Sequence, residues 1–284
     1  MTYNEIIKEI ETLGEIKYFA ITPLGYKIPM VTLGSGKAHT LIVSSIHARE
    51  HITYDLTKLL ASNYPPNLGA IDYVPILNID GVLLAKNGYS FISNTALKKD
   101  LLQQNDYNND FSDWKSNING VDLNVNFDAD WGEGEQNITY PYKQNYIGPQ
   151  ANSETETQGI VNLLKNNDYS LVISYHSKGE VVYWGYEYNF RHYKYAKMVT
   201  DNLGYSLQRS LNSCGGLKDY YSLNYKGLGL TIEVGENKYE HPYPIEQLPN
   251  LYEKHKTSWL LYSKIGGEIA KLNVPSLKRG IDSF

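Results

Sequence analysis

Residues 41–50, Leu-Ile-Val-Ser-Ser-Ile-His-Ala-Arg-Glu, place an imidazole and a carboxylate three positions apart, directly behind an apolar run. The run, residues 41–46, is short, rich in β-branched residues and preceded by Gly-Ser-Gly at 34–36. It therefore predicts a buried β-strand, with His47 and Glu50 on the turn that leads to a helix at about 53–62. Ligand sites in α/β proteins gather at this end of the strands.

His47 and Glu50 supply half of a zinc site. A catalytic zinc site needs three protein ligands and one open position, and two His with one Glu form an established ligand set. Among the seven His of the chain, only His176 shares the setting of His47, because it ends an apolar run at 171–175 and a turn follows it. The alternative is that His47 and Glu50 form an ion pair at a helix start and that His176 is a polar strand end.

A further carboxylate lies inside an apolar segment. Glu233 belongs to Gly-Leu-Thr-Ile-Glu-Val-Gly at 229–235, which predicts another strand. A carboxylate in such a setting is costly unless it is paired or has a raised pKa. Either condition suits a general base, so Glu233 is the candidate base. The alternative is a charge at a strand end that pairs with a nearby Lys.

The chain resembles the zinc carboxypeptidase (M14) family through six motifs in the same order. These are HARE at 47–50, NIDG at 78–81, GVDLNVNF at 120–127, GPQANSETET at 148–157, YHS at 175–177 and TIEV at 231–234. The resemblance implies one zinc ion held by His47, Glu50 and His176, with Glu233 as the base that takes a proton from the catalytic water. It also implies that Asp122 accepts a hydrogen bond from His47, a contact that fixes the tautomer and orientation of a ligand imidazole.

The chain departs from the family pattern where carboxypeptidases bind the substrate's terminal carboxylate. The family has an Arg after the Asn of this motif, whereas Asn124, a candidate substrate-binding residue, is here followed by Val125. An ungapped count back from Glu233 places Leu211 where these enzymes have a mobile, substrate-capping Tyr. Val offers neither bidentate hydrogen bonding nor a compensating charge. We therefore do not expect general C-terminal trimming of peptides.

The same count places Lys218 at the family's selectivity position, in the pocket for the residue that follows the cleaved bond. The stretch Gly-Gly-Leu-Lys-Asp-Tyr at 215–220 and the missing Arg resemble the bacterial branch that cleaves the γ-D-glutamyl bond to meso-diaminopimelate in peptidoglycan stem peptides. Lys218 would hold the distal carboxylate of that diamino acid, and Arg209 is a weaker candidate for the same task. The alternative is that Lys218 only pairs with Asp219 or with solvent.

The resemblance places the family's oxyanion-stabilising Arg at about Lys115, in the segment Phe-Ser-Asp-Trp-Lys-Ser-Asn at 111–117. Lys is a point charge without the fork of Arg. It still stabilises developing negative charge in a dry site. Arg49, beside the candidate ligands, is the other nearby cation. The alternative is that Lys115 is a solvated loop residue.

Apolar runs alternate with helical patterns along the chain. This predicts an α/β fold in one domain, 1–284, with a mixed, mostly parallel β-sheet and helices on both faces. Residues 87–146, rich in Asn, Asp, Tyr and Gly, lack apolar periodicity and are expected to form long loops around the site. The expected strands are 41–46, 73–77, 171–175 and 230–234, and the expected helices lie near 53–62, 156–164, 193–203 and 245–265.

Composition limits the partners. The 284 residues are 42% hydrophobic and 20% charged, as in ordinary globular proteins. The net charge of −5 and the absence of a Lys/Arg run argue against nucleic acid, and no apolar stretch reaches the ~18 residues of a membrane span. Residues 1–14 predict an amphipathic surface helix rather than a signal peptide. We expect a cytoplasmic protein, and release during sporulation or lysis is also compatible with the sequence. The oligomeric state does not follow from the sequence.

Three functions remain open. The first is a zinc metallopeptidase that hydrolyses the γ-D-glutamyl–meso-diaminopimelate bond of peptidoglycan-derived peptides. The second is a zinc carboxypeptidase or N-acyl amino acid deacylase that acts on other small peptides, which Val125 disfavours. The third is a non-catalytic peptide-binding relative, which the joint presence of His47, Glu50, His176 and Glu233 disfavours.

Overall fold

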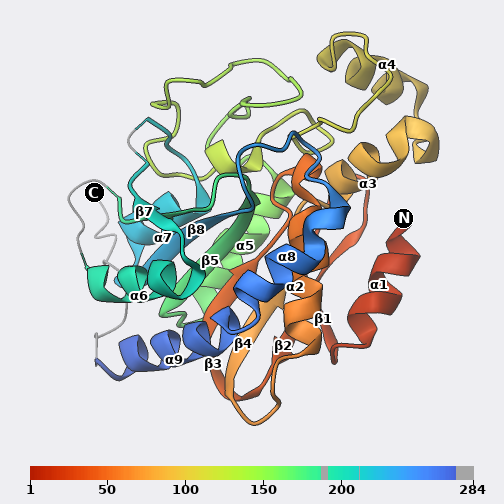
Figure 1. The fold of residues 1–284 in the computed structure, drawn as a ribbon. Helices are drawn as coiled ribbons and strands as arrows, with labels where there is room; N and C mark the ends of the chain where they lie inside the picture. Colours follow the sequence, from red (N-terminus) through yellow and green to blue (C-terminus); the bar gives the residue numbers. More distant parts are fainter. Residues whose placement is uncertain (187–190, 211, 273–284) are drawn as a thin grey trace.

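Eight strands form one mixed sheet in the computed structural model, which describes residues 1–186, 191–210 and 212–272 (Figure 1). The strands are β1 (Ile16–Ile21), β2 (Lys27–Leu33), β3 (Ser35–Val43), β4 (Gly69–Val74), β5 (Leu171–Ser177), β6 (Val181–Trp184), β7 (Ser206–Gln208) and β8 (Leu228–Val234). Their order across the sheet is β1-β2-β4-β3-β5-β8-β6-β7. The pairs β3–β4, β3–β5, β5–β8 and β6–β7 are parallel, and the other three pairs are antiparallel.

Helices cover both faces of this sheet. The α-helices in the described part of the chain are α1 (Tyr3–Glu11), α2 (Ile52–Ser62), α3 (Ile79–Asn87), α4 (Thr95–Gln104), α5 (Thr155–Asn166), α6 (Tyr193–Leu203), α7 (Leu217–Asn224), α8 (Leu248–His255) and α9 (Ser258–Lys271). In Figure 1, α2, α6, α8 and α9 lie in front of the sheet, and α5 and α7 lie behind it. The predicted α/β fold, with a mixed, mostly parallel sheet and helices on both faces, is confirmed. No helix in the described part of the chain is both long enough and apolar enough to cross a membrane.

The central parallel strands explain their own sequence pattern. All seven residues of β5 are buried, and in β8 only Glu233 is partly exposed. Strands covered by helices on both faces need side chains that tolerate burial in both directions, which produces continuous apolar runs rather than alternation. The polar side chains that interrupt these runs therefore need a specific reason to be there.

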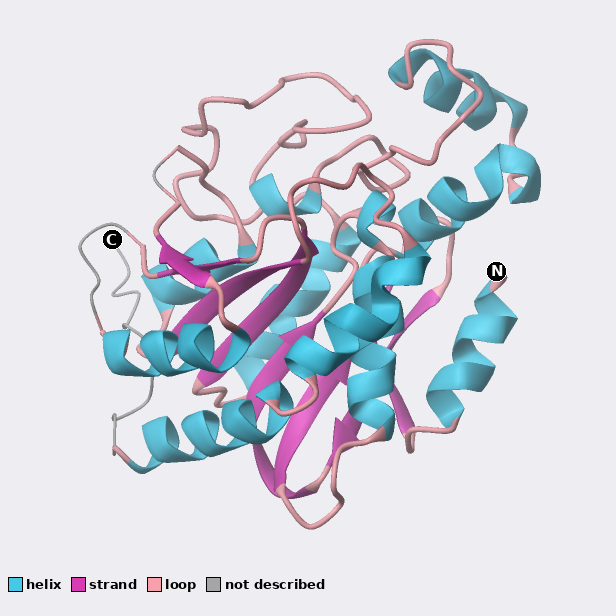
Figure 2. Cartoon of the chain, in the orientation of Figure 1, coloured by secondary structure: helices cyan, strands magenta, loops and turns pink. Residues whose placement is uncertain are grey.

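The strand order reverses beside β3, since the chain continues from β3 to β4 on one side and later adds β5 on the other. Open α/β sheets bind ligands at the carboxyl ends of the strands at such a reversal. Loops gather over one end of the sheet (Figure 2). The residues that follow β3 and end β5 are His47 and His176, so the fold brings these two side chains to the same crevice.

The N-terminal helix is confirmed. Thr2 and Glu5 form a capping box, because the Glu5 N–H donates to the Thr2 hydroxyl and the Thr2 N–H donates to the Glu5 carboxylate, at 3.3 and 2.7 Å. Ile6 and Ile10 pack into the core on the inner side of α1, while charged side chains remain on its outer side. This is the amphipathic surface helix expected from residues 1–14.

Two expectations about secondary structure are wrong in part. The segment 87–146 is not loop throughout, because α4 forms at Thr95–Gln104, where the Asn94 side chain caps the helix and Leu101 anchors it. The single helix expected near 245–265 is two helices, α8 and α9, separated between His255 and Ser258. Apolar periodicity alone does not show a change in helix direction, since both helices turn an apolar side toward the core.

Candidate active site

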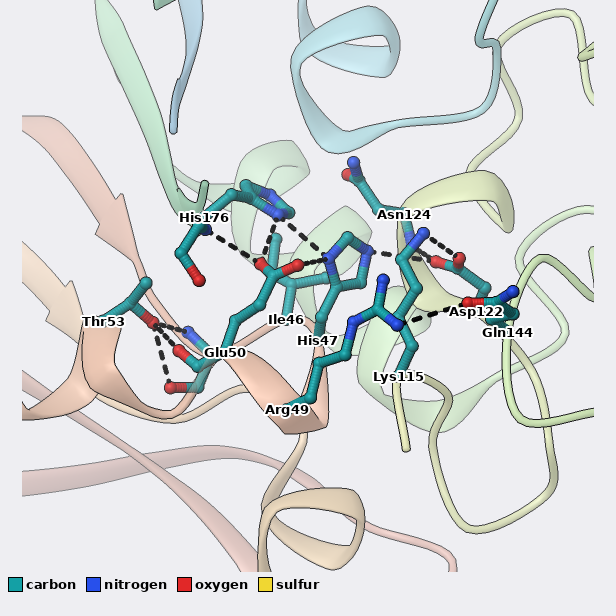
Figure 3. Close-up of polar contacts among 12 residues, drawn as sticks. Ile46, His47, Arg49, Glu50, Thr53, Lys115, Asp122, Asn124, Gln144 and His176 are labelled. Carbon is teal, nitrogen blue, oxygen red and sulfur yellow. Dashed lines mark hydrogen bonds and ion pairs between the residues drawn. The ribbon is translucent and has the colours of Figure 1, made fainter. Parts of the chain in front are cut away.

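His47 and Glu50 are placed by the turn that leaves β3. The Thr53 hydroxyl stabilises this turn, since it donates to the Glu50 carbonyl at 2.8 Å and accepts the Ser45 N–H at 3.0 Å. Residues Ala48–Glu50 form one turn of 3₁₀ helix. As a result the Glu50 carboxylate comes back to the imidazole, with Oε1 at 2.8 Å from Nδ1 of His47 (Figure 3).

His176 completes a group of three buried ligand atoms. Its Nδ1 lies 3.1 Å from Nδ1 of His47 and 3.1 Å from Oε2 of Glu50. The ligand atoms of the three residues all lie within 4.8 Å of one another. The Ser177 N–H also donates to Oε2 of Glu50, at 3.2 Å. Two imidazole nitrogens and one carboxylate that face a common point fit a Zn²⁺ ion.

Asp122 occupies the other side of His47. Its Oδ1 lies 3.2 Å from Nε2 of the imidazole, and its Oδ2 forms an ion pair with Nζ of Lys115 at 2.6 Å. Asp122 is fully buried, which by itself raises the pKa of a carboxyl group, but the charges of Lys115 and His47 hold the pKa of Asp122 well below its usual range. Asp122 is therefore a carboxylate at neutral pH.

Glu233 lies directly beside His176 in the sheet, because the two residues are register partners in the parallel pair β5–β8. Paired residues of neighbouring strands project from the same face of the sheet, so the Glu233 carboxylate shares the surroundings of the ligand group. Burial, together with the negative charge of Glu50, raises the pKa of Glu233 to about 7, although His176 acts in the opposite direction. A carboxyl group with a pKa near the working pH is suited to exchange protons.

A cavity of about 590 Å³ brings most of the candidate site residues together. The candidate site residues that line the cavity are His47, Lys115, Asn124, Arg209, Lys218 and Glu233. Val125, beside Asn124, lines it as well. Arg49 is not among the lining residues and instead bonds to Asp113 at 2.9 Å and to Gln144 at 3.2 Å. Leu211, at the position of the substrate-capping Tyr, lies outside the described residues.

Lys218 lies in the cavity wall, but it is not a solitary cation. Its ammonium group forms an ion pair with the neighbouring Asp219, donates to the Gly185 carbonyl at 2.8 Å and lies 5.6 Å from the ring centre of Tyr186. Asp219 also lines the cavity. The pairing with Asp219, given above as an alternative, is therefore present. Asp219 was not a candidate site residue from the sequence, where two adjacent charges usually indicate a solvated surface; here both residues are only 3% exposed.

Comparison with known proteins agrees with this geometry. The model of the zinc carboxypeptidase family matches residues 11–245. The chain belongs to the zinc carboxypeptidase family. It is accordingly a zinc-dependent hydrolase, and the His47, Glu50 and His176 group of the structure can bind a metal ion.

Two curated bacterial relatives have nearly the same percent identity to the chain, over alignments of different length. It is 30% identical over 279 residues to gamma-D-glutamyl-L-diamino acid endopeptidase 1 of Lysinibacillus sphaericus, in an alignment that covers 89% of this chain and 69% of that protein. It is 31% identical over 202 residues to the uncharacterized protein YqgT of Bacillus subtilis (strain 168), which covers 69% of this chain and 52% of that protein.

Solved structures show the same fold at lower identity. Bovine thrombin-activatable fibrinolysis inhibitor, in complex with tick carboxypeptidase inhibitor, superposes with a TM-score of 0.73 at 19% identity and covers 96% of this chain and 98% of that chain. Murein-tripeptide amidase MpaA from Escherichia coli O157 has a TM-score of 0.62 at 19% identity and covers 88% of this chain and 92% of that chain. These likenesses establish the architecture of the eight-stranded sheet and its helices.

Proposed function

We propose that this zinc peptidase hydrolyses the γ-D-glutamyl bond to meso-diaminopimelate in peptidoglycan stem peptides. The observation that carries the proposal is the lining of the cavity, where Val125 stands beside Asn124 and a buried Lys218 lies in the same wall. A carboxypeptidase needs a cation that binds the terminal carboxylate, and Val is unable to do so. The relative from Lysinibacillus sphaericus, named a γ-D-glutamyl-L-diamino acid endopeptidase, supports the same substrate class.

His47, Glu50 and His176 would hold the zinc ion. When bound, zinc supplies Lewis acidity toward the scissile carbonyl and lowers the pKa of water. Asp122 keeps His47 in the orientation in which Nδ1 faces the ligand group, because it occupies the Nε2 side of the ring at 3.2 Å. The carboxylate of Asp122 also makes the imidazole a better electron donor.

Glu233 would take a proton from the attacking water and deliver it to the leaving nitrogen. The two transfers need a carboxyl group that is stable in both protonation states, and the raised pKa of Glu233, which burial causes, meets this need. Lys115 would stabilise the negative charge that develops on the carbonyl oxygen. It lines the cavity with His47 and Glu233, and its own charge is balanced by Asp122.

Asn124, Lys218 and Arg209 would bind the substrate, since all three line the cavity. Asn124 accepts the Leu217 N–H at 3.2 Å and so connects the region of the zinc ligands to the start of α7. Arg49 would contribute to substrate binding from outside the cavity lining, beside the candidate zinc ligand Glu50. Its guanidinium is fixed by Asp113 and Gln144.

The decisive experiment is digestion of a defined muropeptide by the zinc-loaded protein, with the products identified by mass. The expected products are separated at the γ-D-glutamyl–diaminopimelate bond. The Glu233→Gln variant, loaded with the same metal, serves as the control for contaminating peptidases. Release of ordinary C-terminal residues with a free α-carboxylate, without cleavage of the muropeptide, would instead favour a carboxypeptidase or an N-acyl amino acid deacylase.

A further inference from the structure

We infer that Lys218 and Asp219 act as one recognition unit for a zwitterion, the free amino-acid head at the distal end of the diamino acid, with Lys218 binding its carboxylate and Asp219 its ammonium group. The inference rests on the proposed function and goes beyond it, because it assigns a substrate-binding role to Asp219. It also explains why a cation at this position is accompanied by a buried anion.

The pair is part of the cavity rather than of the surface. Both residues line the cavity that contains His47 and Glu233, and both are only 3% exposed. By contrast, the Lys–Asp pair Lys197–Asp201 on α6 has side chains that are 50% and 61% exposed. An exposed pair needs no special explanation, whereas a buried pair at the wall of a substrate cavity carries a large desolvation cost that a structural role alone does not require.

The charges of the pair decide what kind of side chain fits. Lys218 alone would attract any acidic group, but Asp219 cancels its charge, so the pair is neutral overall. A substrate side chain with a single charge would bring a net charge into this buried site. It would also lie beside the member of the pair that has the same sign of charge. A carboxylate and an ammonium group on the same carbon keep the site neutral and place an opposite charge against each member of the pair.

Each member of the pair has a hydrogen-bonding position left for such a ligand. Within the described part of the chain, two of the three donors of the Lys218 ammonium are used, one by the Gly185 carbonyl and one by Asp219. One oxygen of Asp219 faces Lys218 and the other accepts the Gly216 N–H at 3.2 Å, which leaves acceptor positions on both. Lys218 thus retains a donor for a carboxylate, and Asp219 retains acceptors for an ammonium group.

The position of the pair is fixed relative to the zinc ligands. Asp122, which contacts His47, accepts the Asn124 N–H at 3.0 Å, and the Asn124 side chain accepts the Leu217 N–H at 3.2 Å. Lys218 follows Leu217 in the first turn of α7. This series of contacts lets the site select a head group at a set distance from the cleaved bond, as a diamino acid of fixed length requires.

Four substrates test separately the contributions of the distal carboxylate and the distal ammonium group. In L-Ala-γ-D-Glu-X, the last residue X is meso-diaminopimelate with both groups, 2-aminopimelate with the distal carboxylate alone, Lys with the distal ammonium alone, or norleucine with neither. We expect wild-type kcat/KM for diaminopimelate to exceed each of the other three by roughly 10- to 100-fold, the value of a charged hydrogen bond in a buried site.

Two variants test which residue binds which substrate group, Asp219 the ammonium group and Lys218 the carboxylate. Asp219→Asn should reduce the preference for diaminopimelate over 2-aminopimelate to about threefold or less while the preference over Lys persists. Lys218→Met should remove the preference over Lys. The same two substitutions in the exposed pair, Lys197→Met and Asp201→Asn, are the matched controls and should leave all four ratios unchanged. Circular dichroism and zinc content check that each variant is folded and loaded.

The outcomes are distinguishable from failure of the proposed function. If wild type cleaves none of the four substrates, the proposed function fails and the inference fails with it. If wild type cleaves the diaminopimelate and 2-aminopimelate peptides at equal rates, the proposed function stands and the zwitterion inference is wrong. Persistence of the preference over Lys in folded Lys218→Met would also overturn it, because another cation, such as Arg209, then binds the carboxylate. If Lys218→Met does not fold, the wild-type and Asp219→Asn ratios still decide.

Discussion

Nε2 of His47 lies 3.2 Å from Oδ1 of Asp122, on the side of the imidazole opposite to the nitrogen that faces Glu50 and His176. The two ring nitrogens therefore have separate tasks. One belongs to the candidate zinc site, and the other is held by a carboxylate that Lys115 keeps ionised. The zinc site thus depends on a charge network that extends beyond its three candidate ligands.

Loss of Asp122 should weaken zinc binding. In Asp122→Ala the His47 imidazole loses the partner that fixes its orientation, and we expect zinc affinity or activity to fall roughly 10- to 100-fold. Affinity is measured by competition with a chelator of known strength. Asp106→Ala, which removes an exposed partner of Lys143, is the control and should behave as wild type. An unchanged affinity and activity in Asp122→Ala would remove Asp122 from the site.

Replacement of Glu233 separates proton transfer from metal binding. Glu233→Gln keeps the shape of the side chain but removes the basic carboxylate, so turnover should fall ~10²- to 10⁴-fold with zinc content unchanged. Glu50→Gln is the contrasting variant, since loss of a candidate ligand should lower zinc content itself. Zinc content by atomic absorption and turnover on the same samples separate the two effects. Turnover of Glu233→Gln within about threefold of wild type would rule out its role as the base.

The residues of the candidate site that could be predicted from sequence share one local signature. His47, His176 and Glu233 each stand at or near the end of a strongly apolar run, and a polar group there has few structural purposes. Their meeting in space follows from the parallel arrangement of β3, β5 and β8. The strand order itself was not predicted, because pairing between strands that are far apart in the sequence, 131 residues for Thr40 and Leu171 and 57 for Leu171 and Leu228, leaves no local pattern.

Other features were not predictable for a different reason. The edge strands β1 and β7 have mixed burial, so they lack the apolar runs of the central strands. Asp219 was named only as a possible ion-pair partner of Lys218, since sequence does not show that both charges face a cavity. The loop assignment of 87–146 failed at α4 because a polar helix with only one buried residue, Leu101, has little apolar periodicity.

Stability should depend on pH through Glu156, which is fully buried. Burial, with the nearby charges of Asp80 and Glu154, raises the pKa of Glu156 to about 8. The folded protein then keeps a proton that the unfolded chain releases, so the free energy of unfolding falls as pH rises from about 4.5 to about 8. In Glu156→Gln the neutral amide removes this loss.

The free energy of unfolding of Glu156→Gln, relative to wild type, should therefore increase by about 1 to 4 kcal/mol between pH 5 and pH 8.5. Urea denaturation of both proteins at several pH values measures it. Glu15→Gln, at an exposed position, should show no such trend. A constant difference between Glu156→Gln and wild type across this range would mean that Glu156 is already ionised in the folded state.

The role of Lys115 is tested by separating its two contacts. It neutralises Asp122 at 2.6 Å and also lines the cavity with His47 and Glu233. If it stabilises the charge that develops on the carbonyl oxygen, Lys115→Met should lower kcat ~10²- to 10³-fold with little change in KM, because that charge exists only in the transition state. Lys115→Arg retains the positive charge and should recover most of the loss.

Zinc content distinguishes this role from support of Asp122. Lys143→Met, which removes another Lys from an ion pair with an Asp, is the matched control and should keep wild-type kinetics. If Lys115→Met loses zinc as Asp122→Ala does, but its kcat per bound zinc equals that of wild type, Lys115 acts only through Asp122. Arg49, held by Asp113 and Gln144 beside the candidate ligands, would then be the cation to test next, since a transition-state charge in a buried site still requires a nearby positive group.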